Sequence, residues 1–354
     1  MPTDVAPSII ERIAPVDAEA GERTRAYLDT LTKPPGSLGE LEALAIQLSA
    51  ITGGQTPNVT PASVLVFAAD HGVAEEGVSA FPQAVTAQMV ANFASGGAAI
   101  NVFARQISAN IDVIDVGVAT PLAVAGVTHA KVRPGTANMV LEDAMQGDEA
   151  HSAINAGVAA VERASHAGAR CIIVGEMGIA NTTASSAMLA VLTGTPVAQV
   201  VGAGTGINSA QQAHKVAVIE QAIDARRADP EDPLAVLAKL GGLEIAAMTG
   251  AYLAAAAYRL PVVVDGFIAT VAALTACRLC PDVRGYLVFG HQSEEPGHST
   301  ALEALKAKPL LNLGMRLGEG SGAALAFPLL QAAVAMLNEM ATFADAGVSG
   351  NTGQ

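Results

Sequence analysis

Runs of β-branched and other apolar residues alternate along the chain with longer, alanine-rich stretches. Most runs are apolar at every position, the pattern typical of strands buried on both faces of a parallel sheet. About 20 to 60 residues separate consecutive runs, enough for crossover helices. The six runs that predict strands are residues 64–69, 111–116, 171–174, 197–201, 262–264 and 286–289.

The N-terminal region has a helical period instead. Leucines 41, 44 and 48 and Ile51 recur every three or four residues, and Gly53 and Gly54 follow them. This spacing predicts one helix with an apolar face, ended by glycine. Ser37 and Glu40 match a capping box at its start. The Gly-, Pro- and Thr-rich residues 52–61 then mark a candidate boundary.

The C-terminal region carries a second apolar stripe. Its members are Leu325, Leu329, Ala333, Met336, Met340 and Phe343. Residues 321–338 contain no charge, but they include a proline and a glutamine and are rich in Ala and Gly. We therefore expect a buried helix here, packed against the N-terminal stripe, rather than a membrane span.

Composition narrows the class of protein. Hydrophobic residues make up 51% and charged residues 15%, which excludes intrinsic disorder. The 33 acidic and 19 basic residues give a net charge of −14, so a nucleic-acid-binding surface is not expected. The N-terminus lacks the pattern of a signal peptide, and Cys171, Cys277 and Cys280 cannot form a disulfide framework. These features predict a cytoplasmic protein with free thiols.

Polar residues follow five of the predicted strands. They are Asp70-His71-Gly72, Asp115, Gly175-Glu176, Asp265-Gly266 and the stretch 290–295. Each one alone is ordinary turn or cap chemistry. Ligands of open α/β sheets bind beyond the carboxyl ends of the strands, so the five together predict one composite site.

Three glycine-rich stretches could bring ligands close to the backbone. Residues 202–208, followed by Lys215, could be either a phosphate cradle or a tight turn. In residues 175–183, Glu176 could be an acid/base or could brace the loop. In residues 314–322, Glu319 lies between two glycines, where it could face a ligand or a helix N-terminus.

A metal site is the main alternative on residue chemistry alone. His and carboxylate side chains at strand ends suit zinc or manganese. The candidate ligands are Asp70, His71, Asp265, His291 and His298, although no tight metal-binding spacing connects them.

Several motifs together resemble the nicotinate-nucleotide–dimethylbenzimidazole phosphoribosyltransferases, which activate the lower ligand of cobalamin. The matching segments are residues 33–39, 69–82, 88–90, 96–101, 175–183, 202–206, 264–267, 290–298 and 313–322. They run in order along nearly the whole chain, which makes the resemblance specific. Ala180 departs from the pattern, because the family is expected to have glycine there.

The resemblance implies an α/β fold: a Rossmann-like parallel sheet flanked by helices, with a small helical domain built from both termini. The division would be 1–60 and 321–354 for the helical part and 61–320 for the catalytic part. It also implies a homodimer that needs no metal or other cofactor. The implied reaction transfers the phosphoribosyl group of nicotinate mononucleotide to 5,6-dimethylbenzimidazole, giving α-ribazole 5′-phosphate and nicotinate.

The resemblance assigns roles to residues as well. Glu319 matches the proposed general base, and Glu176 lies near the reacting groups. Gly178, Gly204, Lys215 and Ser293 match positions around the phosphate. Ser79, Gln88, Met177 and Leu317 match the neighbourhood of the base pocket. The expected substrate-binding set is completed from the same motifs and their surroundings by Asn181, Thr182, Thr205, Gly206 and Asp265.

Two other functions remain open on the sequence. One is a metal-dependent phosphate hydrolase built on Asp70, His71, Asp265 and His291. The other is a nucleotide-binding module that uses the glycine loops without turnover. Loss of activity with a chelator would identify the first, and absence of benzimidazole-dependent nicotinate release would identify the second.

Overall fold

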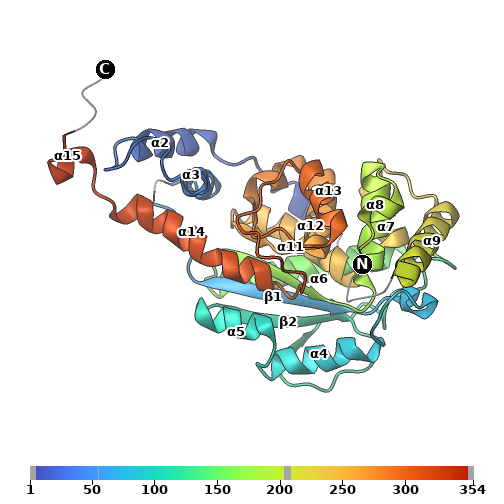
Figure 1. The fold of residues 1–354 in the computed structure, drawn as a ribbon. Helices are drawn as coiled ribbons and strands as arrows, with labels where there is room; N and C mark the ends of the chain where they lie inside the picture. Colours follow the sequence, from blue (N-terminus) through green and yellow to red (C-terminus); the bar gives the residue numbers. More distant parts are fainter. Residues whose placement is uncertain (1–4, 55, 203–208, 350–354) are drawn as a thin grey trace.

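A six-stranded parallel sheet forms the centre of the protein, in a computed structural model that describes residues 5–54, 56–202 and 209–349 (Figure 1). The strand order is β3-β2-β1-β4-β5-β6. The strands are β1 (Ala62–Ala69), β2 (Asn110–Gly117), β3 (Val127–His129), β4 (Cys171–Met177), β5 (Val262–Val264) and β6 (Leu287–Phe289). Every adjacent pair is parallel, which confirms the predicted fold class.

Helices cover both faces of this sheet. They are α1 (Val5–Ile10), α2 (Ala18–Leu28), α3 (Glu40–Thr52), α4 (Ala84–Ala94), α5 (Ala99–Gln106), α6 (Gly147–His166), α7 (Asn181–Thr193), α8 (Val197–Val200), α9 (Ser209–Arg226), α10 (Pro233–Leu240), α11 (Leu243–Ala257), α12 (Phe267–Leu279), α13 (Pro296–Ala304), α14 (Ser321–Glu339) and α15 (Phe343–Ala346). Two 3₁₀ helices, η1 (Gly72–Glu76) and η2 (Pro281–Tyr286), complete the described elements.

Strand β1 shows how the two cores arise. It is buried throughout, and its side chains alternate between the two faces. Leu65 and Phe67 join the apolar cluster of α6, α7, α11 and α12. Val64 and Val66 join the second cluster, with α3, α4, α5 and α14. Figure 1 shows α4 and α5 below the strands and α11 to α13 above them.

One predicted strand is wrong and one strand was not predicted. Residues 197–201 contain the short helix α8, with Val197, Val200 and Val201 buried at helical spacing. Pro196 directly precedes this helix, and α8 packs against α7 and α13. The missed strand, β3, has three residues of which only Val127 is buried, so it has no apolar run to reveal it.

The predicted packing of α14 against α3 is confirmed. Phe327, Leu330 and Leu337 of α14 share a cluster with Leu44 and Leu48 of α3. The predicted stripe was partly wrong, because Leu325 and Leu329 are only half-buried and Phe343 lies beyond the end of the helix. The small residues Ala323 and Ala324 let the first turn of α14 approach the sheet closely. The buried face of the helix is therefore rotated away from Leu325 and Leu329.

The predicted capping box is also wrong. Helix α3 begins after Gly39, with no side-chain cap. The Leu38 N–H donates instead to Glu42 Oε1 at 2.9 Å, and the Lys33 ammonium lies 2.8 Å from the same oxygen. Glu40 points elsewhere and pairs with Lys308. The buried Glu42 carboxylate, paired with Lys33, therefore fixes the start of α3.

Helix α14 is also the one described helix that is long and apolar enough to cross a membrane. More than half of its apolar window is buried inside the protein. The three cysteines are free thiols, as predicted.

Candidate active site

A cavity of about 360 Å³ opens beyond the carboxyl ends of β4, β5 and β6, where the strand-end residues were expected to meet. Its wall combines polar groups with a larger apolar surface. The lining residues are Phe81, Val85, Met89, Glu176, Met177, Gly178, Ile179, Asn181, Thr182, Gly266, Phe267, Ile268, Ala269, His291, Ser293, Glu295, Arg316, Leu317, Gly318 and Glu319.

Glu176 enters this cavity from the end of β4 and is buried. Its Oε2 accepts a hydrogen bond from Asn181 Nδ2 at 2.5 Å, and the nearby backbone N–H of Glu319 also favours its charged form. Burial, with the nearby charges of Glu244 and Asp265, raises the pKa of Glu176 to about 8. Because the desolvation of the charged form outweighs these hydrogen bonds, Glu176 carries a proton at neutral pH.

Glu319 approaches from the loop before α14. Its φ of +65° is left-handed, and so are those of Gly318 and Gly320. Its Oε2 accepts the Ile100 N–H at 3.3 Å, at the first turn of α5. Burial raises the pKa of Glu319, Ile100 opposes the shift and Asp265 adds to it. A helix N-terminus thus favours the charged form of this carboxylate.

The two glutamates are held by backbone contact as well. A Cβ added to Gly175, the residue before Glu176, would lie 2.2 Å from the carbonyl oxygen of Glu319. A Cβ added to Gly318 would lie 2.2 Å from Glu176 Oε1. Only glycine allows β4 and the loop before α14 to approach this closely.

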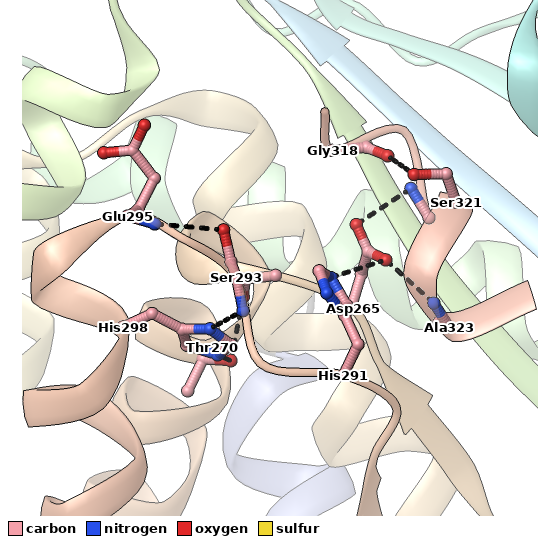
Figure 2. Close-up of polar contacts among 11 residues, drawn as sticks. Asp265, Thr270, His291, Ser293, Glu295, His298, Gly318, Ser321 and Ala323 are labelled. Carbon is pink, nitrogen blue, oxygen red and sulfur yellow. Dashed lines mark hydrogen bonds and ion pairs between the residues drawn. The ribbon is translucent and has the colours of Figure 1, made fainter. Parts of the chain in front are cut away.

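Asp265, at the end of β5, fixes the loop that carries Glu319 (Figure 2). Its carboxylate accepts the Gly320 N–H at 3.2 Å and the Ala323 N–H at 2.9 Å. The Ser321 hydroxyl donates to the Gly318 carbonyl at 2.7 Å. His291 Nε2 lies 3.6 Å from Asp265 Oδ1. Burial raises the pKa of Asp265, and His291 opposes that shift.

His298 fixes the loop after β6 in a similar way (Figure 2). The Ser293 N–H donates to His298 Nδ1 at 2.8 Å, which leaves the ring proton on Nε2, 2.9 Å from Thr270 Oγ1. Burial, with the nearby His291, lowers the pKa of His298 to about 3, so the ring is neutral. The Glu295 N–H donates to Ser293 Oγ at 3.4 Å. Because both ring nitrogens of His298 have hydrogen-bond partners, the ring holds Ser293 and the rest of the loop after β6 in place.

The candidate metal ligands lie in separate contacts rather than around one point. His71 lies against Glu244, His291 against Asp265 and His298 against Thr270. Within residues 5–54, 56–202 and 209–349, no three His, Cys, Asp or Glu side chains are grouped so that they could hold a metal ion. The described geometry gives no support to the hydrolase alternative.

Lys215 lies on α9 behind the cavity wall rather than on it. Its side chain is buried, and its Nζ donates to Thr182 Oγ1 at 2.8 Å. Burial lowers the pKa of Lys215 to about 8, and the charge of Glu295 opposes the shift. Burial in turn raises the pKa of Glu295, against the charges of Lys215 and Arg316. Lys215 therefore acts on the cavity indirectly, through its hydrogen bond to Thr182 and its charge interaction with Glu295, both of which line the cavity.

The structure brings together many of the expected site residues. Those that line the cavity are Glu176, Met177, Gly178, Asn181, Thr182, Ser293, Leu317 and Glu319. Lys215 and Asp265 do not line the cavity, but each contacts a residue that does. Ser79 accepts the Phe81 N–H, and Gln88 is exposed, so neither lines the cavity. Gly204, Thr205 and Gly206 lie outside the described residues.

Sequence reasoning missed part of the apolar wall. Val85 and Met89 line the cavity from one face of α4, four residues apart, whereas Gln88 lies on the exposed side. Their helical spacing was the available signal. Phe267 and Arg316 lie inside motifs that had been matched, but no role had been assigned to them.

Comparisons with known proteins agree with this geometry. The profile of a phosphoribosyltransferase family matches residues 13–348. The nicotinate-nucleotide–dimethylbenzimidazole phosphoribosyltransferase of Halalkalibacterium halodurans is 51% identical over 342 residues, 97% of this chain and 96% of the relative. The enzyme of the same name from Pseudomonas putida is 52% identical over 336 residues, 95% of this chain and 96% of the relative.

Solved structures agree as well. The crystal structure of CobT from Thermus thermophilus matches with a TM-score of 0.91 and 47% identity, covering 94% of this chain and all of that one. The chain therefore belongs to the nicotinate-nucleotide–dimethylbenzimidazole phosphoribosyltransferase family.

Proposed function

We propose that this chain transfers the 5-phosphoribosyl group of nicotinate mononucleotide to 5,6-dimethylbenzimidazole, giving α-ribazole 5′-phosphate and nicotinate for the nucleotide loop of cobalamin. Family membership supports the reaction. The observation that carries it to this chain is the pair of buried glutamates, Glu176 and Glu319, which lie at the same largely apolar cavity where Gly175 and Gly318 let their backbones approach closely.

The chemistry needs one base and no acid. A benzimidazole nitrogen attacks C1′ of the ribose from the face opposite nicotinate, which inverts the β-linkage to α. The C1′–N bond to nicotinate breaks, and its electron pair returns to the pyridine nitrogen, which leaves uncharged. The second imidazole nitrogen must then lose its proton. General-base catalysis of this kind contributes about 10²–10⁴-fold.

Glu319 is the residue suited to be that base. The N-terminus of α5 favours its charged form, and the Ile100 N–H occupies only one of its two oxygens. Glu176 holds a proton at neutral pH. In that state it can donate its O–H to a substrate oxygen, and it does not repel the anionic nucleotide. Different environments thus give two neighbouring carboxyl groups different roles.

The nucleotide binds at the side of the cavity where α7 begins. The first turn of α7 presents Asn181 and Thr182 and its backbone N–H groups, a favourable place for a phosphate. Lys215 supplies positive charge through Thr182, which a protein of net charge −14 needs at an anionic ligand. Ser293 lies at the same cavity.

The flat benzimidazole binds against the apolar wall. Met177 and Leu317 were expected there, and Phe81, Val85 and Met89 extend the surface. Apolar and aromatic side chains with a few polar groups are typical of such sites. Ser79 and Gln88 do not line the cavity, but we retain them as residues of its neighbourhood because they lie close in sequence to those three residues.

The assembly and location follow the family. The chain works as a homodimer in the cytoplasm, without a cofactor. Residues 1–60 and 321–354 form a small helical domain beside the catalytic part, 61–320. The packing of α3 against α14 supports that division.

The decisive experiment measures nicotinate release from nicotinate mononucleotide with and without dimethylbenzimidazole. Release that requires the base, together with α-ribazole 5′-phosphate as product, supports the proposal. Phosphate release instead would point to a hydrolase, and nucleotide binding without turnover would point to a binding module.

A further inference from the structure

A buried polar cluster lies outside the cavity wall, beneath the loop that follows β4. Its members are Asp70 and His71 at the end of β1, Thr86 on α4 and Glu244 on α11, each 1% exposed or less. His71 Nε2 and Glu244 Oε1 are 2.6 Å apart. None of the four lines the cavity. The Asp-His-Gly motif after β1 thus has no part in the site described above.

The cluster supports the cavity-lining loop 177–180 at two consecutive residues. A Cβ added to Gly178 would lie 3.2 Å from Glu244 Oε1 and 3.3 Å from His71 Nε2. The next residue, Ile179, donates its N–H to Thr86 Oγ1 at 3.1 Å. The loop therefore rests directly on the buried polar groups.

Thr86 connects that support to Asp70. Burial raises the pKa of the Asp70 carboxyl, and the neighbouring Thr86 side chain opposes that shift. Asp70 Oδ2 also accepts the Ala119 N–H at 2.8 Å. The loop ends in Ala180, which has a left-handed φ of +75°. Strained backbone of this kind persists only where its surroundings hold it.

The same cluster reaches Glu176 electrostatically. Glu244 lies beside the loop at Gly178, two residues after Glu176. Burial raises the pKa of Glu176, and the charge of Glu244 raises it further. Burial alone would lower the pKa of His71, but Glu244 and Asp70 raise it above its ordinary value. His71 can carry at most one positive charge, so it can offset at most one of the two carboxylates beside it. The ionisable groups around Glu176 include Glu244 and Tyr252 from α11, Asp265 at the end of β5 with His291 beside it, and Glu319 and Arg316 from the loop before α14.

We propose that Asp70, His71 and Glu244 are positioning residues for phosphoribosyl transfer. Through Thr86 and Gly178 they hold the 177–180 loop in place. Through the charge of Glu244 they keep the proton on Glu176, which leaves Glu319 to act as the base. This assignment rests on the proposed function, because it concerns which of the two glutamates serves that reaction.

Glu244→Gln tests the electrostatic part, because it keeps the shape of the side chain and removes its charge. We expect Glu176 to lose its proton about one pH unit lower than in the wild type. Difference infrared spectra against Glu176→Gln, recorded in both backgrounds on the resting protein, measure this directly. The fall of kcat/KM at alkaline pH should move by the same amount. An unchanged titration of Glu176 would overturn the proposal.

Asp115→Asn is the matched control. Asp115 is equally buried at the end of the neighbouring strand β2, but it accepts the Val118 N–H and pairs with Lys131. Its replacement should leave both the Glu176 titration and the alkaline limb where they are. A shift as large as that of Glu244→Gln would mean that any buried carboxylate has the effect, which contradicts a specific role.

Thr86→Val tests the positioning part, also in case Glu244→Gln fails to fold. It removes the hydroxyl that Ile179 contacts and keeps every charge. We expect KM for nicotinate mononucleotide to rise about 2- to 10-fold, with the alkaline limb unmoved. A wild-type KM would overturn the positioning role. If the wild-type protein releases no nicotinate, the proposed function fails, whereas the infrared titration still decides this proposal.

Discussion

The loop after β4 and the loop before α14 each present one glutamate to the same cavity, but they hold it differently. Glu176 belongs to the end of a central strand, is surrounded by other carboxylates and keeps a proton. Glu319 sits on three left-handed residues and faces the N-terminus of α5. Burial raises the pKa of both carboxyl groups, but the nearby charges of Glu244 and Asp265 raise that of Glu176 further, to about 8, whereas the end of α5 opposes the shift at Glu319. The contrast shows how position alone separates two identical side chains.

The first prediction separates the roles of the two loops and has the largest effect. Glu319→Gln should lower kcat by about 10²–10⁴-fold while binding of nicotinate mononucleotide is kept, because only the base is removed. Steady-state kinetics and nucleotide titration measure the two quantities. Wild-type turnover in this variant, with a large loss in Glu176→Gln, would reverse the assignment.

The position of the loop after β4 could be predicted from the strand pattern, whereas the loop before α14 was placed at the site by the family resemblance. Five apolar runs became strands, and the residues that follow them include Glu176 and Ser293 at the cavity. Parallel strands end at one edge of a sheet, so no tertiary knowledge was needed to gather them. Residues 197–201 were wrongly predicted as a strand. When every residue of a short run is apolar, the sequence does not show whether the buried positions have the spacing of a strand or of a helix.

The environments of the glutamates could not be predicted. Glu244 lies in an apolar helix without any motif, and its partner His71 is 173 residues away in the chain. The capping-box error has the same origin, since Lys33 lies outside the local pattern that Ser37 and Glu40 matched. Local patterns identify elements and their ends, whereas charge pairing depends on which distant residues meet.

The second prediction tests whether the β4 side of the cavity serves the nucleotide. Lys215→Ala should weaken nicotinate mononucleotide by about 1.5–3 kcal/mol, or roughly 10- to 100-fold, and dimethylbenzimidazole much less. Only the nucleotide carries a phosphate. Calorimetric titration of each ligand gives the comparison. Lys131→Ala, which removes a lysine paired with Asp115, is the control and should change neither affinity. Equal loss of affinity for both ligands would show that Lys215 does not serve the phosphate.

The third prediction disturbs the contact between the two loops. Gly318→Ala would place a Cβ 2.2 Å from Glu176 Oε1, and Gly314→Ala introduces the same kind of backbone strain with no atom within 4 Å. Both glycines have positive φ, so their difference isolates the contact. We expect kcat/KM to fall about 10-fold further in Gly318→Ala than in Gly314→Ala. Equal losses would mean that backbone strain alone accounts for both.

The last prediction measures the proton on Glu176 through the stability of the protein. Burial raises its folded pKa from 4.5 to about 8, so the folded state binds this proton more tightly than the unfolded state does. Its contribution to stability is then full below pH 4.5 and is lost as pH rises toward 8, by at most about 1.4 kcal/mol per pH unit. Glu176→Gln cannot ionise, so its stability relative to the wild type should increase from pH 5.5 to pH 8. Urea unfolding at several pH values gives this difference, with Glu142→Gln, an exposed carboxylate, as the control. A difference between Glu176→Gln and the wild type that does not change with pH would place the negative charge on Glu176 throughout, and the contrast between the two loops would disappear.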